Sequence, residues 1–158
     1  MDGFKPSPTP LELVQQQARK PANTASIRLD HIPDGGVNIR QDGSKSGTGG
    51  HYLRSPTVQV NRVTGDADAF GVTKGFVSIR DPSNGAWVPK QMETTFYPSA
   101  WSKRQTQLEI EGAFQNSSPM PGTSKWQGTS PSGLKIQGYY DKPAGTGATA
   151  WPVYQGKN

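Results

Sequence analysis

Apolar and polar residues alternate along three stretches in the middle of the chain. Apolar side chains recur at every second position within 56–63 (PTVQVNRV), 71–81 (GVTKGFVSIRD) and parts of 86–97 (AWVPKQMETTFY). A period of two is typical of a strand that buries one face. Turn-forming residues at 64–65 and 83–85 separate the stretches. We therefore expect three strands, arranged as an antiparallel meander.

A helical period occurs at two places. Residues 11–20 (LELVQQQARK) are good helix formers with apolar positions three and four apart, and Pro21 follows them. A second helix is expected over 99–116 (SAWSKRQTQLEIEGAFQN), because Pro98 precedes a serine that can cap it and apolar residues line part of one face. We expect this second helix to pack on the sheet.

A closing hairpin is expected at the end of the chain. Its strands are 133–140 (GLKIQGYY) and 146–154 (TGATAWPVY), joined by a turn at 141–145, and a Pro/Gly/Ser-rich loop precedes it. The elements together predict an α+β fold, with an N-terminal helix and loop region followed by an antiparallel β-sheet with one packed helix. We divide the chain into a lead-in at 1–22 and one domain at 23–158.

A polar, glycine-rich segment lies between the first helix and the first strand. Residues 28–52 (RLDHIPDGGVNIRQDGSKSGTGGHY) have too little apolar periodicity for a long helix or a deep strand, so we expect a loop. This segment contains both histidines of the chain, His31 and His51. Loops on a rigid scaffold are common positions for catalytic groups. The small residues before His51 leave room for a phosphate to approach the backbone.

The composition narrows the classes of partner and of site. The net charge of +5 favours a polyanionic partner, such as nucleic acid or an acidic protein. The chain has no cysteine, which excludes a disulfide framework and a thiolate metal site. No apolar run approaches the ~18 residues of a membrane span, and the first ten residues lack the apolar stretch of a signal peptide. We expect no membrane association, and any export signal to lie outside this sequence.

Two histidines supply the minimum chemistry for cutting RNA without a metal. That reaction needs a base for the 2′-hydroxyl proton, an acid for the leaving 5′-oxygen and a cation for the phosphorane charge. An ordinary histidine pKa of about 6.5 allows one copy to be neutral and another charged near neutral pH. The alternative is that His31 and His51 are ordinary surface residues. A zinc enzyme is a weaker alternative, because no metal-ligand spacing supports it.

Several motifs add a family resemblance. His31 stands in LDHIP and His51 in GTGGHYLRSP, and further along are WVPKQMETTFYPSAW, WQGTSPSGLKIQGYYDKP and TAWPVYQ. Together they resemble the bacterial EndoU nuclease domain at the C-termini of polymorphic and contact-dependent toxins. The resemblance covers residues 30–155. It implies an EndoU-like ribonuclease fold, a metal-independent endoribonuclease activity and no cofactor.

The resemblance also implies a catalytic triad of two histidines and a lysine. These roles carry over to His31, His51 and, by its distance from the second histidine, Lys90, with Lys74 as the competing lysine. By resemblance His51 acts as the base and His31 as the acid, which gives 2′,3′-cyclic phosphate and 5′-hydroxyl ends. The alternative is that Lys90 is a solvated lysine at the end of a strand.

The C-terminal TAWP resembles a substrate-binding element of the family. Thr149 then contacts substrate, Trp151 stacks on a base in place of the usual Tyr or Phe, and Tyr154 is a possible source of a hydroxyl. A similar comparison implies that Thr94 or Thr95 contacts the base. The structural alternatives are core packing for the tryptophan and sheet surface for the two strand threonines.

The expected partners follow from the same resemblance. RNA, most simply tRNA, is the expected substrate, and a cognate immunity protein with an acidic surface is the expected protein partner of a chain that is otherwise monomeric. Delivery by a bacterial export system would take the domain to the cytoplasm of a target cell. A non-catalytic RNA-binding module of the same fold is the alternative function. Basic residues that stand near the histidines in the sequence either neutralise flanking phosphates or are scattered solvated charges: Arg28, Arg40, Lys45, Arg54 and Arg62.

Overall fold

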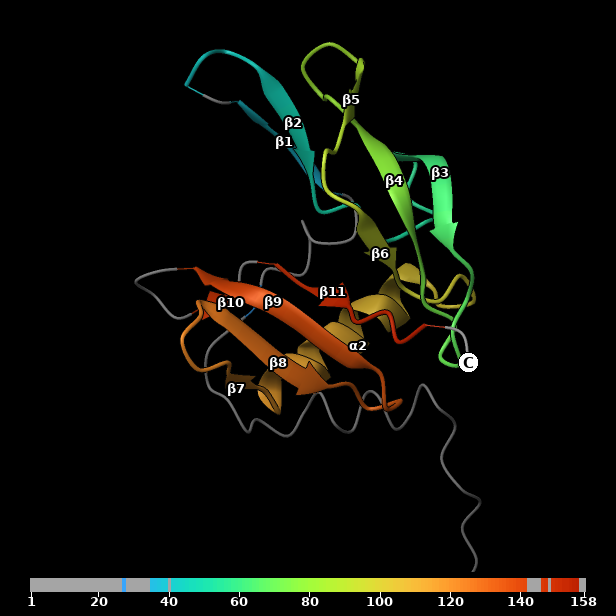
Figure 1. The fold of residues 1–158 in the computed structure, drawn as a ribbon, viewed down its shortest axis with the longest axis vertical. Coiled ribbons are helices and arrows are strands. Elements are labelled where there is room, and N and C mark those ends of the chain that lie inside the picture. The colour runs from blue at the N-terminus through green and yellow to red at the C-terminus, as the bar shows by residue number, and fades with distance from the viewer. Residues whose placement is uncertain (1–26, 28–34, 40, 142–145, 148, 157–158) are drawn as a thin grey trace, which may run out of the picture.

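A computed structural model gives the fold of this chain. It describes residue 27 and the ranges 35–39, 41–141, 146–147 and 149–156 (Figure 1). The predicted helix at 11–20 and His31 lie outside the described residues. The described part consists mostly of antiparallel strands with one α-helix, in agreement with the strand-rich half of the predicted fold. No helix within these ranges is long and apolar enough to cross a membrane.

The first sheet confirms the predicted antiparallel meander. It is built around β4 (Thr73–Arg80), which pairs on one side with β3 (Val58–Gly65). On its other side β4 pairs with both β5 (Trp87–Pro89) and β6 (Thr94–Phe96). The core of this sheet holds Val58, Val77, Ile79 and Phe96.

The stretch 86–97, predicted as one strand, is two strands with a break. Trp87 to Pro89 pair with residues 78–80 of β4, whereas 94–96 pair with 73–75, so the two strands lie end to end along β4. The backbone N–H of Lys90 still donates to the carbonyl of Val77, at 2.9 Å, and the chain then leaves the sheet until Thr94. Pro89 at the break has no N–H to donate to a ladder, which is consistent with a strand that ends there.

A hairpin replaces part of the predicted loop at 28–52. Its strands are β1 (Gly36–Ile39) and β2 (Lys45–Thr48), paired antiparallel (Figure 1). The turn between them is closed by Asp42, whose carboxylate accepts from the backbone N–H of Ser44 at 2.9 Å, and by Gly43, whose φ of 85° suits glycine. The prediction was wrong here because main-chain pairing and turn chemistry form this hairpin without apolar alternation.

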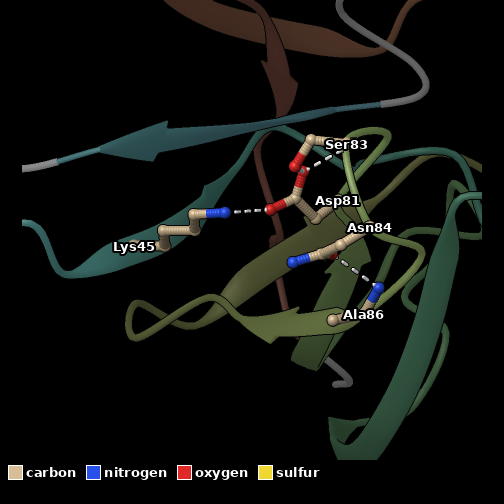
Figure 2. Close-up of polar contacts among 5 residues, drawn as sticks. All are labelled: Lys45, Asp81, Ser83, Asn84 and Ala86. Atoms are coloured by element: carbon tan, nitrogen blue, oxygen red, sulfur yellow. Dashed lines mark hydrogen bonds and ion pairs between the residues drawn. The ribbon is translucent and has the colours of Figure 1, made fainter.

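An ion pair fastens the hairpin to the first sheet. Lys45 Nζ at the start of β2 lies 2.6 Å from Oδ2 of Asp81, which follows the end of β4 (Figure 2). The other carboxylate oxygen accepts from the backbone N–H and the hydroxyl of Ser83, at 2.9 and 2.7 Å. Hydrogen bonds from Lys45 and Ser83 lower the pKa of Asp81 to about 2, so the carboxylate stays charged. The anchored strand leads directly towards His51.

The second sheet contains the closing hairpin and two strands that were predicted as loop. β9 (Lys135–Asp141) pairs with β10 (Thr146–Gly147) and β11 (Trp151–Pro152), which confirms the hairpin. β8 (Lys125–Thr129) and β7 (Ser118–Pro119) complete the sheet. The short sequence of β8 gave no strand signal because its buried positions are Trp126 and Gly128.

The helix α2 (Lys103–Gln115) packs on β8 and β9 of the second sheet. It begins four residues later than the predicted start at 99, because 98–101 form a turn and the Ser102 hydroxyl, not that of Ser99, accepts from the N–H of Gln105 at 3.0 Å. Figure 1 shows the helix behind the two strands. The buried core between helix and sheet includes Ile110, Ala113, Phe114, Trp126, Leu134 and Ile136.

Candidate active site

His51 stands just beyond β2, beside the edge of β6. Gly49 and Gly50, with φ of 67° and 76°, turn the chain after the hairpin. A Cβ on Gly50 would lie 2.5 Å from Ile79 Cδ1, and the positive φ of this residue also favours glycine. The His51 carbonyl then accepts from the backbone N–H of Tyr97 at 2.9 Å. The two glycines thus place the His51 imidazole beside the sheet, just beyond the end of the hairpin.

The His51 ring is held in one tautomer. Its Nδ1 lies 2.7 Å from the carbonyl oxygen of Thr95, and because a carbonyl only accepts, Nδ1 carries the proton. The side chain is 6% exposed, and burial, together with the charge of Lys90, lowers the pKa of His51 from 6.5 to about 3. The ring is therefore neutral near pH 7, with an unprotonated Nε2 that can take a proton.

Lys90 reaches the same place from the break between β5 and β6. Its ammonium donates to the carbonyl of Gly49 at 3.0 Å, two residues before His51. Burial lowers the pKa of Lys90 to about 8, so most of the population is charged at pH 7. The structure thus brings together the neutral imidazole of His51 and the poorly solvated cation of Lys90.

Lys74, the competing lysine, is occupied elsewhere. Its ammonium lies 3.4 Å from a carboxylate oxygen of Glu93 and 5.0 Å from the centre of the Tyr154 ring. Although Lys74 is opposite Thr95 in the strand register, its charge is partly neutralised by that acid. This geometry favours Lys90 as the cation beside His51.

The two threonines of β6 have different surroundings. Thr94 is buried, with its hydroxyl 3.5 Å from the Met92 carbonyl. Thr95 supplies the carbonyl that orients His51, and its hydroxyl oxygen is buried with no hydrogen-bond partner in the described part of the chain. The orienting carbonyl is a functional group that sequence reasoning missed, and no residue type could have signalled it because it is main chain.

The C-terminal residues lie on β11 and beside it. The Thr149 hydroxyl accepts from the backbone N–H of Tyr139 at 2.9 Å. Trp151 is half-buried against the Tyr139 ring, with centroids 5.3 Å apart, and is not part of the buried core. The Tyr154 hydroxyl donates to the carbonyl of Asp66 at 2.8 Å. Because β11 also contacts β6, this region adjoins the strand whose Thr95 carbonyl orients the His51 ring.

The described basic residues near His51 in the sequence make internal contacts. Lys45 is paired with Asp81, Arg54 donates to the Trp101 carbonyl at 2.6 Å, and Arg62 lies over the Phe76 ring. Arg28 and Arg40 lie outside the described residues. The predicted role of this group in neutralising phosphates is therefore not apparent in the contacts of the described members.

No group of three or more His, Asp or Glu side chains suited to a metal ion occurs among the residues that the structure describes. The described site consists of a proton acceptor and a cation. Such a pair can move a proton next to an anion and stabilise negative charge. They supply the base and the cation, two of the three groups needed for metal-independent cleavage of a phosphodiester, and so favour the class of phosphodiester-cleaving enzymes.

The comparison with protein families agrees with this class. The family model of the bacterial EndoU nuclease matches residues 26–154, most of the chain. The chain therefore belongs to the bacterial EndoU nuclease family, whose members are endoribonucleases, and its substrate is RNA. No curated protein and no solved structure matches it at a significant level.

Proposed function

We propose that this chain cuts RNA by transesterification, with His51 as the general base, His31 as the general acid and Lys90 as the stabilising cation. The observation that carries the proposal is the neutral imidazole of His51, whose Nδ1 is fixed on the Thr95 carbonyl beside the Lys90 ammonium. Such a ring accepts a proton only at Nε2.

The reaction proceeds by one displacement. Nε2 of His51 takes the proton of the 2′-hydroxyl while O2′ attacks phosphorus, and the bond from phosphorus to O5′ breaks. His31 gives a proton to O5′, so the products are a 2′,3′-cyclic phosphate and a 5′-hydroxyl. Lys90 stabilises the additional negative charge on the phosphorane oxygens. The proton transfers and bond changes of this reaction need no metal or other cofactor.

Substrate contacts are assigned to the residues around β6 and β11. Trp151 offers a partly exposed ring on which a base stacks, and Thr149, two residues earlier in the chain, contacts the same substrate. The Thr95 hydroxyl, buried but unpartnered within the described chain, is assigned to a base edge in preference to that of Thr94, which lies 3.5 Å from the Met92 carbonyl. The Tyr154 hydroxyl oxygen can still accept a hydrogen bond while its proton is donated to the carbonyl of Asp66.

The biological setting is proposed from the family and the charge. We propose tRNA as the substrate, because structured RNA of a target cell suits a bacterial toxin nuclease. A cognate immunity protein with an acidic surface would match the net charge of +5, and delivery by an export system would bring the monomeric domain at 23–158 to the cytoplasm of that cell.

The decisive experiment incubates total tRNA with the protein in EDTA. The wild type is compared with His31→Ala, His51→Ala and Lys90→Ala, and Arg104→Ala, which removes an exposed charge from α2, is the matched control. Each active-site variant is expected to lower the rate at least ~100-fold, with cyclic phosphate ends on the wild-type fragments. Bound but intact RNA with the wild type would instead favour the non-catalytic RNA-binding module.

A further inference from the structure

One face of the second sheet is free of the helix and carries an aromatic pair. Side chains alternate along β8 and β9, and the buried set faces α2, which lies behind these strands in Figure 1. The intervening positions form the opposite surface, which we call the outer face. Its described residues are Lys125, Gln127, Thr129, Lys135, Gln137, Tyr139 and Trp151.

Two rings and one ammonium meet at the edge of this outer face. The Tyr139 and Trp151 rings contact each other at a tilt of 56°. Lys125, opposite Tyr139 in the register, places its Nζ 5.5 Å from the centre of the tyrosine ring and 5.9 Å from that of the tryptophan. Tyr139 is 43% exposed, so its ring is available to a ligand.

The charge of the outer face suits an anion with stacking groups. It includes the two cationic side chains of Lys125 and Lys135. Gln137 donates to Gln127 at 2.7 Å, which leaves further amide groups at the surface. Aromatic rings beside cations and amides are the features by which proteins bind single-stranded nucleic acid.

The outer face continues towards the candidate active site. Trp151 belongs to β11, and β11 contacts β6, whose Thr95 carbonyl orients His51. Tyr139 lies on the other side of the Trp151 ring, on β9. An RNA strand with one base stacked on Trp151 therefore meets a second ring, Tyr139, and a cation, Lys125, at its neighbouring nucleotide.

We propose, on the basis of the proposed ribonuclease function, that Tyr139 and Lys125 form an additional nucleotide-binding site beyond the dinucleotide that is cut. The Tyr139 ring stacks on the base of a flanking nucleotide, and the Lys125 ammonium binds that nucleotide's phosphate. The substrate class is consequently RNA with a single-stranded segment longer than two nucleotides at the cut.

The first test compares cleavage of an RNA octamer with cleavage of a dinucleotide. Tyr139→Ala is expected to lower kcat/KM about tenfold more on the octamer than on the dinucleotide, whereas Tyr139→Phe keeps the ring and stays near wild type. Trp87→Ala is the matched control, because Trp87 has the same 43% exposure but lies on the first sheet. Equal losses on both substrates, or no loss on the octamer, would overturn the proposal.

A second measurement separates this site from the cleavage reaction. A 2′-O-methyl RNA octamer cannot be cut, so fluorescence anisotropy reports its binding alone. Tyr139→Ala and Lys125→Met should each weaken binding, and Lys125→Met should also reduce the salt slope by about 0.7. If the wild type cuts no RNA but shows this pattern, the nuclease proposal fails and the binding site stands. If the wild type cuts RNA and both variants bind normally, only the binding site fails.

Discussion

The ammonium of Lys90 donates to the carbonyl of Gly49, and so joins the break between β5 and β6 to the loop that carries His51. This contact supports the assignment of Lys90 as the catalytic cation in preference to Lys74, which is paired with Glu93. It also places a positive charge where it lowers the pKa of His51. The site is therefore an electrostatic unit, and its parts respond together to substitution and to pH.

Replacing the two lysines should have unequal effects. Lys90→Met is expected to lower kcat/KM for RNA at least ~100-fold, the usual effect of removing a group that stabilises transition-state charge. Lys74→Met should change it less than about threefold, because its charge is already engaged by Glu93. Single-turnover rates on tRNA check this difference. Comparable losses in both variants would contradict the assignment.

RNA binding should weaken in alkaline solution. Burial lowers the pKa of Lys90 to about 8, so the free protein loses this positive charge as the pH rises through that value. The Kd of a 2′-O-methyl RNA octamer is expected to increase between pH 7 and pH 9.5 in the wild type. Lys90→Met should remove this pH dependence, and Lys74→Met should retain it. A wild-type Kd that stays constant over this range would argue against a role for Lys90 in binding phosphate.

The stability of the fold should fall in mild acid because of His51. Its pKa is about 3 in the folded protein against 6.5 ordinarily, so between these values the unfolded state binds the additional proton. The free energy of unfolding then decreases by about 1.4 kcal/mol per pH unit as the pH falls below 6.5. Urea unfolding at pH 7, 6 and 5 measures this slope. His51→Gln should have a correspondingly shallower slope, and an unchanged one would show that His51 titrates normally in the folded state.

The ion pair of Lys45 and Asp81 should affect activity by holding in position the hairpin that leads to His51. Asp81→Asn and Lys45→Met each release the hairpin that leads to His51, and about a tenfold loss of kcat/KM is expected. The double variant should lose no more than either single variant, because both remove the same contact. If Lys45 instead binds an RNA phosphate, Lys45→Met alone will weaken activity and Asp81→Asn will leave it intact.

Periodicity predicted the elements that bury one regular face. The strands around residues 58–65, 73–80 and 135–141 and the helix α2 follow from apolar alternation or helical spacing. The β1–β2 hairpin was missed because its stability derives from main-chain pairing and the Asp42-Gly43 turn. β8 was missed because a buried tryptophan between small and polar residues gives no period.

The sequence proposed the residue types of the candidate site but not their geometry. The family resemblance picked out His51 and Lys90, and the structure places them in one environment. The choice between Lys90 and Lys74 needed the break at 90–93, which arises from pairing to β4 and has no marker except Pro89. The position of His31 relative to these groups stays a prediction, since that residue lies outside the described ranges.

The connector at 90–93 carries a consequence for the evolution of this site. Because β5 and β6 are each registered separately on β4, inserting or deleting a residue in the connector would leave both pairings intact. Because the Lys90 N–H is itself bonded to the Val77 carbonyl, a change of length after Lys90 would also leave the ammonium in place. Loop length here is thus open to drift or to laboratory engineering without redesign of the scaffold or displacement of the cation.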